Sequence, residues 1–475
     1  MGIFGALTTA ITGLRTQSTA LEHISNNIAN SQTVGFKRTD TSFSELVPDS
    51  APREQAPGVV QAFSRATNTV QGDVSNSDIS TFVAINGDGY FIVGEQTGTA
   101  DGNPVFSSED LYTRRGDFEI DRFGNLKNGA GYFLKGLSIN TETGNIAGSV
   151  PEIVTISNDF LAARATTEVD YRVNLPSFPL TSNQSDSVDF SELLNRGTTG
   201  AVDGTIFNND PRASGDGLVQ GQDSDAFISR SIAGGAITTF DGAGQGLNVQ
   251  FRWAKIDSSL NTVSEGTPPS TTHNDVWNLF YLVDGSATGT ATAWNNVGTD
   301  YTFGTNGLLN PDITSVAGLT LTLPGGTLTG ITIDHGSLGI TQFADANGTS
   351  TVNTINQDGY SAGELSAVSI TDDGEVNVSY SNGESVNIAQ ITLATFNSDA
   401  DLQKLDGGSF RATQESGEPI LSGAGAVVGR ALEASNTDIA DEFTKLIVTQ
   451  QAYSANTRII TTADEILQEA LNIIR

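Results

Sequence analysis

The segment GYSAG, residues 359–363, places a serine at the G-x-S-x-G spacing with which α/β hydrolases expose a nucleophile. That chemistry requires a buried strand before Ser361, a helix after it and a histidine further along the chain. Polar residues precede the serine here, an alternating apolar pattern follows it, and the last histidine, His335, comes before it. The sequence therefore predicts a turn into a strand at this point instead of a catalytic serine.

Three histidines and two acidic pairs are the remaining candidates for metal ligands. They are His23, His273 and His335, then Asp223 with Asp225, and Asp372 with Asp373. The histidines lack the spacing of a zinc site, and the acidic pairs could bind calcium weakly but do not follow the EF-hand pattern. The glycine-rich segments 242–246 and 423–429 lack the strand-glycine-helix setting of a phosphate loop. We therefore predict no catalytic, cofactor-binding or metal-binding residues, no cofactor and no enzymatic activity.

The composition of the 475-residue chain narrows the classes of partner. It has 23 basic and 55 acidic residues, a net charge of −32, and no lysine or arginine between Lys255 and Lys404. Such a chain can hardly neutralise phosphates, which argues against nucleic acid and membrane surfaces as partners. The absence of cysteine, of a long apolar run and of any basic residue before Arg15 predicts no disulfide, no membrane span and no cleaved secretory signal. Export would need another route.

Both ends of the chain carry apolar residues at seven-residue spacing, which predicts long helices with an apolar stripe. The N-terminal stripe consists of Leu7, Leu14, Leu21 and Ile28, with Ile11 beside it. The C-terminal stripe consists of Ile439, Leu446, Tyr453, Ile460, Leu467 and Ile474, with Phe443 beside it. We call these twelve residues the predicted seam.

The C-terminal helix is predicted to begin near residue 436. Ser435 and Asp438 fit a capping box, and Asp441 with Lys445 forms a favourably oriented pair one turn apart. Glycines in the N-terminal helix and several threonines in the C-terminal one lower the intrinsic helix propensity. Packing against other surfaces must therefore stabilise both helices.

Between the helices the apolar residues alternate with polar ones, which predicts β-strands. Residues 82–93 have the pattern of a hairpin around the turn Gly87-Asp88-Gly89. The run 368–393 alternates in the same way, with hairpin turns at Asp373-Gly374 and Asn382-Gly383. Further strands are predicted at 249–253, 279–283 and 319–323.

The predicted fold class is mainly β and multidomain, with long α-helices at both termini that pair as an axial, coiled-coil-like domain. The expected domains are 1–30 with 432–475 as the helical axial core, 31–75 as an extended linker that includes the proline-rich segment 47–58, 76–160 with 355–431 as an inner β domain, and 161–354 as one or more outer β domains. The chain then runs outward and returns, which brings its ends side by side.

The predicted seam has two interpretations. It could be closed within one chain as a helix hairpin. Alternatively, because the C-terminal stripe is longer than its N-terminal partner, apolar surface is left over, and such surface usually marks an assembly interface. We expect the second arrangement, with the leftover face buried only between subunits.

Segments near both ends resemble the flagellar rod and hook proteins. Residues 25–43, SNNIANSQTVGFKRTDTSF, are similar to the signature that follows the first helix of that family, and residues 435–474 are similar to its C-terminal helix. AINGDGYFIV and YTRRGDFEIDRFGNL match the first β domain of the family, and residues 358–384 also resemble hook proteins. These segments cover about a fifth of the chain, and residues 161–354 carry no family motif.

The resemblance implies a non-enzymatic subunit of the flagellar hook, a tube that joins rod to filament and transmits torque while bending. It implies a homopolymer exported by the type III apparatus, with rod, hook-cap and hook-filament junction proteins as neighbours and an extracellular location. Distal rod proteins of the same family are much shorter, since they lack a large middle insertion.

Two alternatives stay open at this point. One is a distal rod subunit of the basal body, which shares both end signatures. The other is a secreted acidic β protein of the adhesin or surface-layer type, for which a net charge of −32 would serve solubility.

Overall fold

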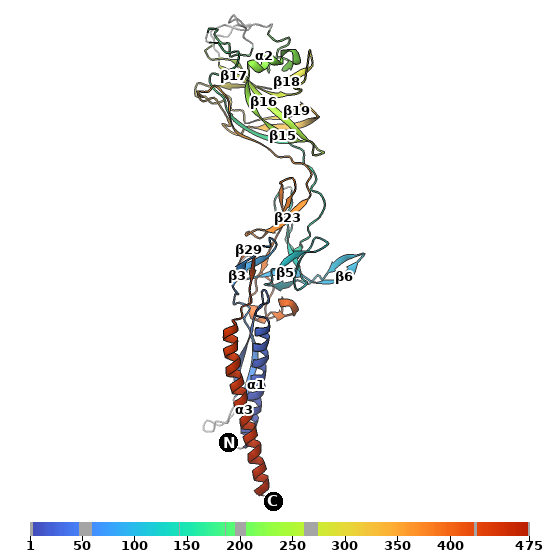
Figure 1. Cartoon of the computed structure of the whole chain (residues 1–475), viewed down its shortest axis with the longest axis vertical. Coiled ribbons are helices and arrows are strands. Elements are labelled where there is room, and N and C mark those ends of the chain that lie inside the picture. Colours follow the sequence, from blue (N-terminus) through green and yellow to red (C-terminus); the bar gives the residue numbers. More distant parts are fainter. Residues whose placement is uncertain are drawn as a thin grey trace. The chain divides into compact units, whose positions relative to one another are not determined.

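The computed structural model describes residues 3–46, 59–141, 143–185, 187–194, 206–260, 274–421 and 425–473. The chain forms two compact units, the first from residues 1–159 and 365–475 and the second from 160–364 (Figure 1). Most of the regular structure is β, and long helices lie at the two ends of the chain. The predicted fold class is therefore confirmed.

The two end helices are α1 (Ile3–Ala29) and α3 (Ile439–Ile473), which lie side by side (Figure 1). The α3 helix begins three residues later than predicted, because Asp438 caps it: its Oδ1 accepts hydrogen bonds from the amides of Ala440 at 2.8 Å and Asp441 at 3.3 Å. Ser435 Oγ instead accepts from the amide of Thr437, so the predicted capping box does not form. Within the described residues, no helix is long and apolar enough to cross a membrane.

The predicted ion pair on α3 has a different partner. Lys445 Nζ lies 2.6 Å from Glu442 Oε1, one turn earlier, and 3.4 Å from Asp40 Oδ1. Asp441 is exposed and makes no ion pair among the described residues. Glu442 faces α1, so the pairing of α3 with its neighbours, and not the local charge spacing, selects the partner of Lys445.

The segment expected as an extended linker contains an antiparallel hairpin. Strands β1 (Thr39–Leu46) and β2 (Val59–Ala66) pair throughout, with Thr39 opposite Ala66 and Leu46 opposite Val59. The hairpin lies along α1. The proline-rich connector 47–58 falls outside the described residues.

The remainder of the first unit is a β domain built from both halves of the chain. Its strands are β3 (Val74–Asn76), β4 (Val83–Asn86), β5 (Tyr90–Gly94), β6 (Gln96–Ala100), β7 (Asn103–Phe106), β8 (Leu111–Thr113), β9 (Phe118–Ile120), β10 (Leu126–Asn128), β11 (Phe133–Ser138), β12 (Glu152–Ile153), β23 (Leu365–Ile370), β24 (Glu375–Tyr380), β25 (Ser385–Gln390), β26 (Leu393–Ala394), β27 (Gln403–Lys404), β28 (Ser409–Arg411), β29 (Ala426–Gly429) and β30 (Ala431–Glu433). Its largest sheet follows the order β23-β24-β25-β11-β5-β8-β28-β27. Strands from both halves bury one apolar core around Phe91, Phe118 and Val376.

Two predicted hairpins in this domain are confirmed and a third is wrong. The hairpins β23–β24 and β24–β25 form as predicted, with Gly374 and Gly383 at positive φ in their turns. The strands of 82–93 exist but do not pair with each other: β4 pairs with β29, and β5 joins the large sheet beside β8 and β11. Partners from distant sequence compete successfully with the local turn.

The second unit is built from two five-stranded sheets. Its elements are β13 (Glu168–Asn174), β14 (Leu218–Gln220), α2 (Ser224–Ser229), β15 (Ile232–Phe240), β16 (Gly246–Asp257), β17 (Asp275–Leu282), β18 (Thr292–Phe303), β19 (Ser315–Leu323), β20 (Gly326–Asp334), β21 (Ile340–Thr341) and β22 (Thr351–Gln357). Inward-facing residues of both sheets share one core, in which Trp253, Trp277 and Tyr301 are fully buried. The strands predicted at 249–253, 279–283 and 319–323 are present as β16, β17 and β19, the second of which ends at Leu282.

The GYSAG segment lies at the C-terminal boundary of the second unit. The expected boundary at residue 354 falls inside β22, which pairs with β13, so the unit continues to 364. Tyr360 and Gly363 form antiparallel bridges with Arg164 and Leu161. Ser361 lies in this short ladder, without a buried strand before it or a helix after it.

The buried histidine of the second unit belongs to its core. His335 Nδ1 donates to the carbonyl of Tyr171 at 2.8 Å, and its Nε2 accepts from the Tyr301 hydroxyl at 3.0 Å, since a carbonyl can only accept. Burial lowers the pKa of His335, opposed in part by its bond to the Tyr171 carbonyl. His335 is therefore neutral in the folded unit at neutral pH.

Acid should destabilise the second unit through His335. Below the ordinary pKa of 6.5, this histidine binds a proton in the unfolded chain but stays neutral in the folded unit, because its folded-state pKa is lower. The free energy of unfolding therefore falls by up to about 1.4 kcal/mol per pH unit. Denaturant unfolding at pH 7.5 and 5.5 measures this by tryptophan fluorescence, since Trp253, Trp277 and Trp294 all lie in this unit. His335→Asn should remove most of the difference in the free energy of unfolding between the two pH values, whereas Tyr301→Phe, which keeps the imidazole, should retain it. If His335→Asn showed the same difference as the parent, this account would be contradicted.

Candidate assembly face

The α1 and α3 helices contact each other through small and polar side chains. Asn27 Nδ2 donates to Glu442 Oε2 at 3.1 Å, and a Cβ at Gly13 would lie 3.0 Å from the side-chain nitrogen of Asn456. Gly13 precedes Asn27 by the same interval at which Asn456 follows Glu442, so these two contacts fix an antiparallel register.

This register brings two seven-residue series face to face. They are Ala6, Gly13, Ala20 and Asn27 on α1, and Glu442, Thr449, Asn456 and Ala463 on α3. Ala20, Asn27, Glu442, Thr449 and Ala463 are buried. The predicted seam is offset from these series, by one residue on α1 and by three on α3, so its large apolar side chains flank the contact. Small residues permit the close approach of the two backbones, which large side chains would prevent.

The β1–β2 hairpin covers one face of the helix pair. His23 of α1 bonds to Thr41 Oγ1 at 2.8 Å and Ser64 Oγ at 3.1 Å, and Lys445 of α3 reaches Asp40. Partial burial acts to lower the pKa of Lys445, but the Glu442 and Asp40 carboxylates outweigh it and raise that pKa. His23 and Lys445 each follow a residue of the contact series by three positions, so both lie on one flank of the pair.

The opposite flank carries ten residues of the predicted seam. We call them the assembly face: Leu7, Leu14, Leu21, Ile28, Ile439, Phe443, Leu446, Tyr453, Ile460 and Leu467. The α1 residues and Phe443 follow the contact series by one position, about 100° from it on the side opposite His23 and Lys445, whereas the other α3 residues follow it by four positions, about 40° from it and close to the contact itself. Ile439, Phe443 and Tyr453 are exposed and the other seven are half-buried. A continuous stripe without charge on a single chain is a surface suited to another protein.

Two residues of the predicted seam fall elsewhere. Ile11 is 50% exposed and lies on the side of α1 away from α3, so it is not part of the stripe. Ile474 lies outside the described residues. Tertiary packing therefore retains ten of the twelve positions on one surface, although not on the surface between the two helices.

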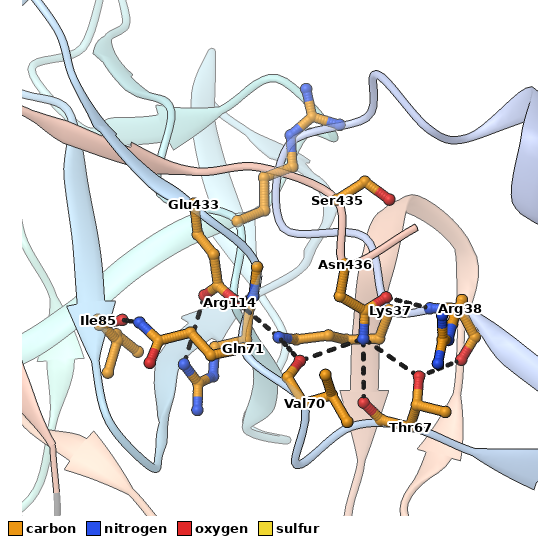
Figure 2. Close-up of polar contacts among 12 residues, drawn as sticks. Lys37, Arg38, Thr67, Val70, Gln71, Ile85, Arg114, Glu433, Ser435 and Asn436 are labelled. Carbon is orange, nitrogen blue, oxygen red and sulfur yellow. Dashed lines mark hydrogen bonds and ion pairs between the residues drawn. The ribbon is translucent and has the colours of Figure 1, made fainter. Parts of the chain in front are cut away.

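The helix pair is attached to the β domain by a buried ion cluster (Figure 2). Glu433, at the end of β30, lies between two cations: its Oε1 is 2.6 Å from Lys37 Nζ and its Oε2 is 3.3 Å from Arg114 Nη1. All three side chains are almost completely buried. Burial lowers the pKa of Lys37, and the Glu433 carboxylate opposes that effect. We call Lys37, Arg114 and Glu433 the anchor cluster.

Backbone groups add hydrogen bonds to all three residues of the anchor cluster, and Arg114 Nε is the buried atom of the cluster that has no hydrogen-bond partner within the described residues. Lys37 Nζ also donates to the Val70 carbonyl at 2.6 Å, Arg114 Nη2 donates to the Gly87 carbonyl at 2.8 Å, and Glu433 Oε1 accepts from the Gly72 amide at 2.9 Å. A buried charge is tolerable only when it is paired and hydrogen-bonded in this way.

Asn436 ties together three chain segments beside the cluster (Figure 2). Its Oδ1 accepts from the Arg38 amide at 2.8 Å, and its Nδ2 donates to the carbonyls of Thr67 at 3.2 Å and Val70 at 3.1 Å. The start of α3, the entry to the hairpin and its exit therefore share one side-chain amide.

Glycine is required where these segments cross. At Gly35, which has a positive φ of 65°, a Cβ would lie 2.8 Å from the Arg114 backbone. At Gly72 a Cβ would lie 2.0 Å from the Ala434 carbonyl oxygen. Any side chain at either position would therefore force the backbones apart.

Sequence reasoning missed the anchor cluster as a site. Lys37 and Arg114 lie inside two of the segments quoted for the family resemblance, and Glu433 lies just before a third. The available signal was a single carboxylate in the apolar stretch around Ala431, Leu432 and Ala434, at an inward position of a strand. Which cations face it depends on contacts hundreds of residues apart.

The other candidates do not form a site. Asp223 is buried and accepts bonds from the backbone and side chain of Asn208, while Asp372 accepts from the Gly429 amide. His273 lies outside the described residues, and no group of three possible metal ligands occurs within the described ranges.

Removing the charge of Glu433 should destabilise the first unit strongly. Glu433→Gln leaves two buried cations without a counter-charge, which costs about 3–5 kcal/mol. The matched control is Glu109→Gln, whose exposed pair with Arg411 contributes at most about 1 kcal/mol. Chemical unfolding followed by ellipticity at 222 nm measures both, because the long helices belong to this unit. Equal effects of the two variants would refute the role assigned to Glu433.

Two glycines of α1 should respond differently to substitution. A Cβ at Gly5 meets nothing within 4 Å, so Gly5→Ala should gain about 0.8–1.0 kcal/mol of helix stability. At Gly13 the same gain is offset by crowding against Asn456, and Gly13→Leu should separate the helices. Thermal unfolding followed by ellipticity at 222 nm measures the change in stability of both variants. A Gly13→Leu variant as stable as the parent would show that the helices do not pair in this register.

Comparison with known proteins shows that the segments forming the helix pair and the anchor cluster match known protein families. Family models match three parts of the chain: "Flagella basal body rod protein" at residues 7–37, "Flagellar hook protein FlgE/F/G D1 domain" at 84–160 and "Flagellar basal body rod FlgEFG protein C-terminal" at 428–473. These ranges contain all three residues of the anchor cluster and all ten residues of the assembly face.

Relatives match along the whole chain. The flagellar hook protein FlgE of Salmonella typhimurium is 28% identical over 474 residues, covering 98% of each chain. FlgE of Caulobacter vibrioides is 26% identical over 599 residues, and FlgE of Escherichia coli K12 is 27% identical over 478. The crystal structure of Helicobacter pylori flagellar hook protein FlgE2 aligns with 76% of this chain and all of its own at 17% identity and a TM-score of 0.49. In the three segments matched by family models the chain is similar to flagellar rod and hook proteins, and along its whole length it is similar to flagellar hook proteins.

Proposed function

We propose that this chain is a structural subunit of the flagellar hook, which polymerises into a flexible tube between rod and filament. The carrying observation is the end-to-end match to hook proteins, which includes the second unit as well as the family segments at both ends. A distal rod subunit shares the end segments, but the relatives that cover the whole of this chain are named hook proteins. The mechanism is one of assembly, without a catalytic step.

The driving force for assembly is the apolar surface that the helix pair leaves incompletely buried. The contact series between α1 and α3 consists of Ala, Gly, Thr, Asn and Glu, which bury little apolar area, while leucines, isoleucines and two aromatic residues lie on the assembly face. Burying that face between copies supplies the stabilisation that the pair lacks by itself, at about 25 cal/mol per Å². Ordering of the helices and polymerisation are therefore coupled.

The anchor cluster gives this assembly its direction. It holds the helix pair to the β domain through buried charges and bonds from three chain segments, so the pair does not swing freely on a linker. Neighbours that bury the assembly face consequently place their β domains at a defined position. Torque can then be transmitted from the helices to the β domain of each subunit.

The proposal extends to partners and location. A hook subunit would pass through the type III export apparatus without a cleaved signal, polymerise outside the cell, and meet rod, hook-cap and hook-filament junction proteins at the ends of the tube. The chain carries no cysteine and its net charge is −32, both compatible with an extracellular location.

Deleting either helix should abolish polymerisation and leave the β domains folded. Chains lacking residues 1–28 or 436–475 lose one side of the assembly face but keep Lys37, Arg114 and Glu433. Both should retain the tryptophan fluorescence of the second unit and sediment as monomers at concentrations where the intact chain forms tubes by electron microscopy. Tubes formed by either truncated chain would contradict the proposal.

A further inference from the structure

The face of the helix pair that bears the hairpin contains a groove of about 600 Å³. Its walls come from three elements: α1 contributes Ala20 and Ile24, β1 contributes Phe43, and α3 contributes Val448 and Ala452. Phe43 is 48% exposed and Val448 is 61% exposed. Phe43 and Val448 therefore present apolar surface to solvent in this groove, whereas Ala20 and Ile24 are buried.

The charges around the groove are largely satisfied by one another. Lys445 pairs with Glu442 and Asp40, and His23 is bonded to Thr41 and Ser64. Arg65 at the edge makes no ion pair among the described residues. A surface that brought its own carboxylates or cations into this groove would disturb those pairs, whereas a surface without charge would not.

The assembly face has that character. None of its ten residues is charged at neutral pH, and on α3 it extends from Ile439 to Leu467, a length of about 40 Å. Two adjacent helices, each about 10 Å across, give that face about 800 Å², which is the area that one partner contributes to a stable protein interface.

We propose that the assembly face of one copy docks on the hairpin groove of the next copy. This inference rests on the proposed function and specifies which two surfaces meet. If assembly faces paired with each other around a two-fold axis, the interface would close at a dimer and leave Phe43 and Val448 in water. Face-to-groove contact covers both surfaces, and since each copy then still offers one free surface of each kind, growth continues as an open helical polymer.

Two substitutions on α3 test this arrangement. Phe443→Asp places a charge on the assembly face, and Val448→Asp places the same charge in the groove. The two positions are five residues apart on one helix, are 49% and 61% exposed, and receive the same new residue, so each variant controls for the other. Unchanged ellipticity and unfolding midpoints establish that both full-length chains are folded.

Neither variant alone should form tubes, and the concentration needed for assembly should rise at least tenfold for each. An equimolar mixture should give a one-to-one dimer in analytical ultracentrifugation, because Phe443→Asp retains an intact groove and Val448→Asp retains an intact assembly face. The dimer should not grow further, since its two free surfaces are the damaged ones.

Three results would overturn the inference and leave hook function standing, provided that the unsubstituted chain forms tubes. They are a dimer formed by Val448→Asp alone, which means that assembly faces pair with each other; a mixture that stays monomeric; and tubes formed by either variant at the normal concentration. Failure of the unsubstituted chain to form tubes at high concentration and in a precipitating salt would instead refute the proposed function.

Discussion

The arrangement of the first unit depends on one buried carboxylate. Glu433 meets Lys37 from the segment after α1 and Arg114 from the β domain, so its two oxygens join the beginning of the chain, its interior and the segment that leads into α3. Charges so completely removed from water stabilise one geometry, because any shift that breaks a pair leaves an uncompensated ion. The neighbouring bonds of Asn436 and the close backbone contacts at Gly35 and Gly72 restrict the same crossing further.

The helix pair follows a different rule from the cluster that holds it. Its internal contact uses small and polar residues, which allow the helices to approach closely but bury little apolar surface. Its large apolar residues lie beside that contact, where Ile439, Phe443 and Tyr453 are exposed and the other seven are half-buried. In the proposed assembly, contacts within one molecule and contacts between molecules therefore use different sides of the same two helices, so that strong contacts between molecules do not require a rigid helix pair within each one.

The sequence predicted the local features well and the pairings less well. Seven-residue spacing revealed both helices, and Asp373-Gly374 and Asn382-Gly383 revealed two hairpins, because each signal is contained in a few turns or strands. The strands at 82–93 took partners over three hundred residues away in one case, which no local turn reveals. The spacing of large apolar residues located the assembly face, but the series that pairs the helices consists of residues that carry little hydrophobic signal. The anchor cluster depends on contacts between three distant segments and was not predictable as a set.

The second unit enters and leaves through one short ladder, in which Leu161 faces Gly363 and Arg164 faces Tyr360. Because the two ends of the second unit meet in this way, the chain of the first unit is interrupted at a single place. The size of the inserted unit can therefore change without distorting the first unit. Evolution can enlarge, shrink or replace the inserted unit while the sequence that forms the helices and the ion cluster stays as it is.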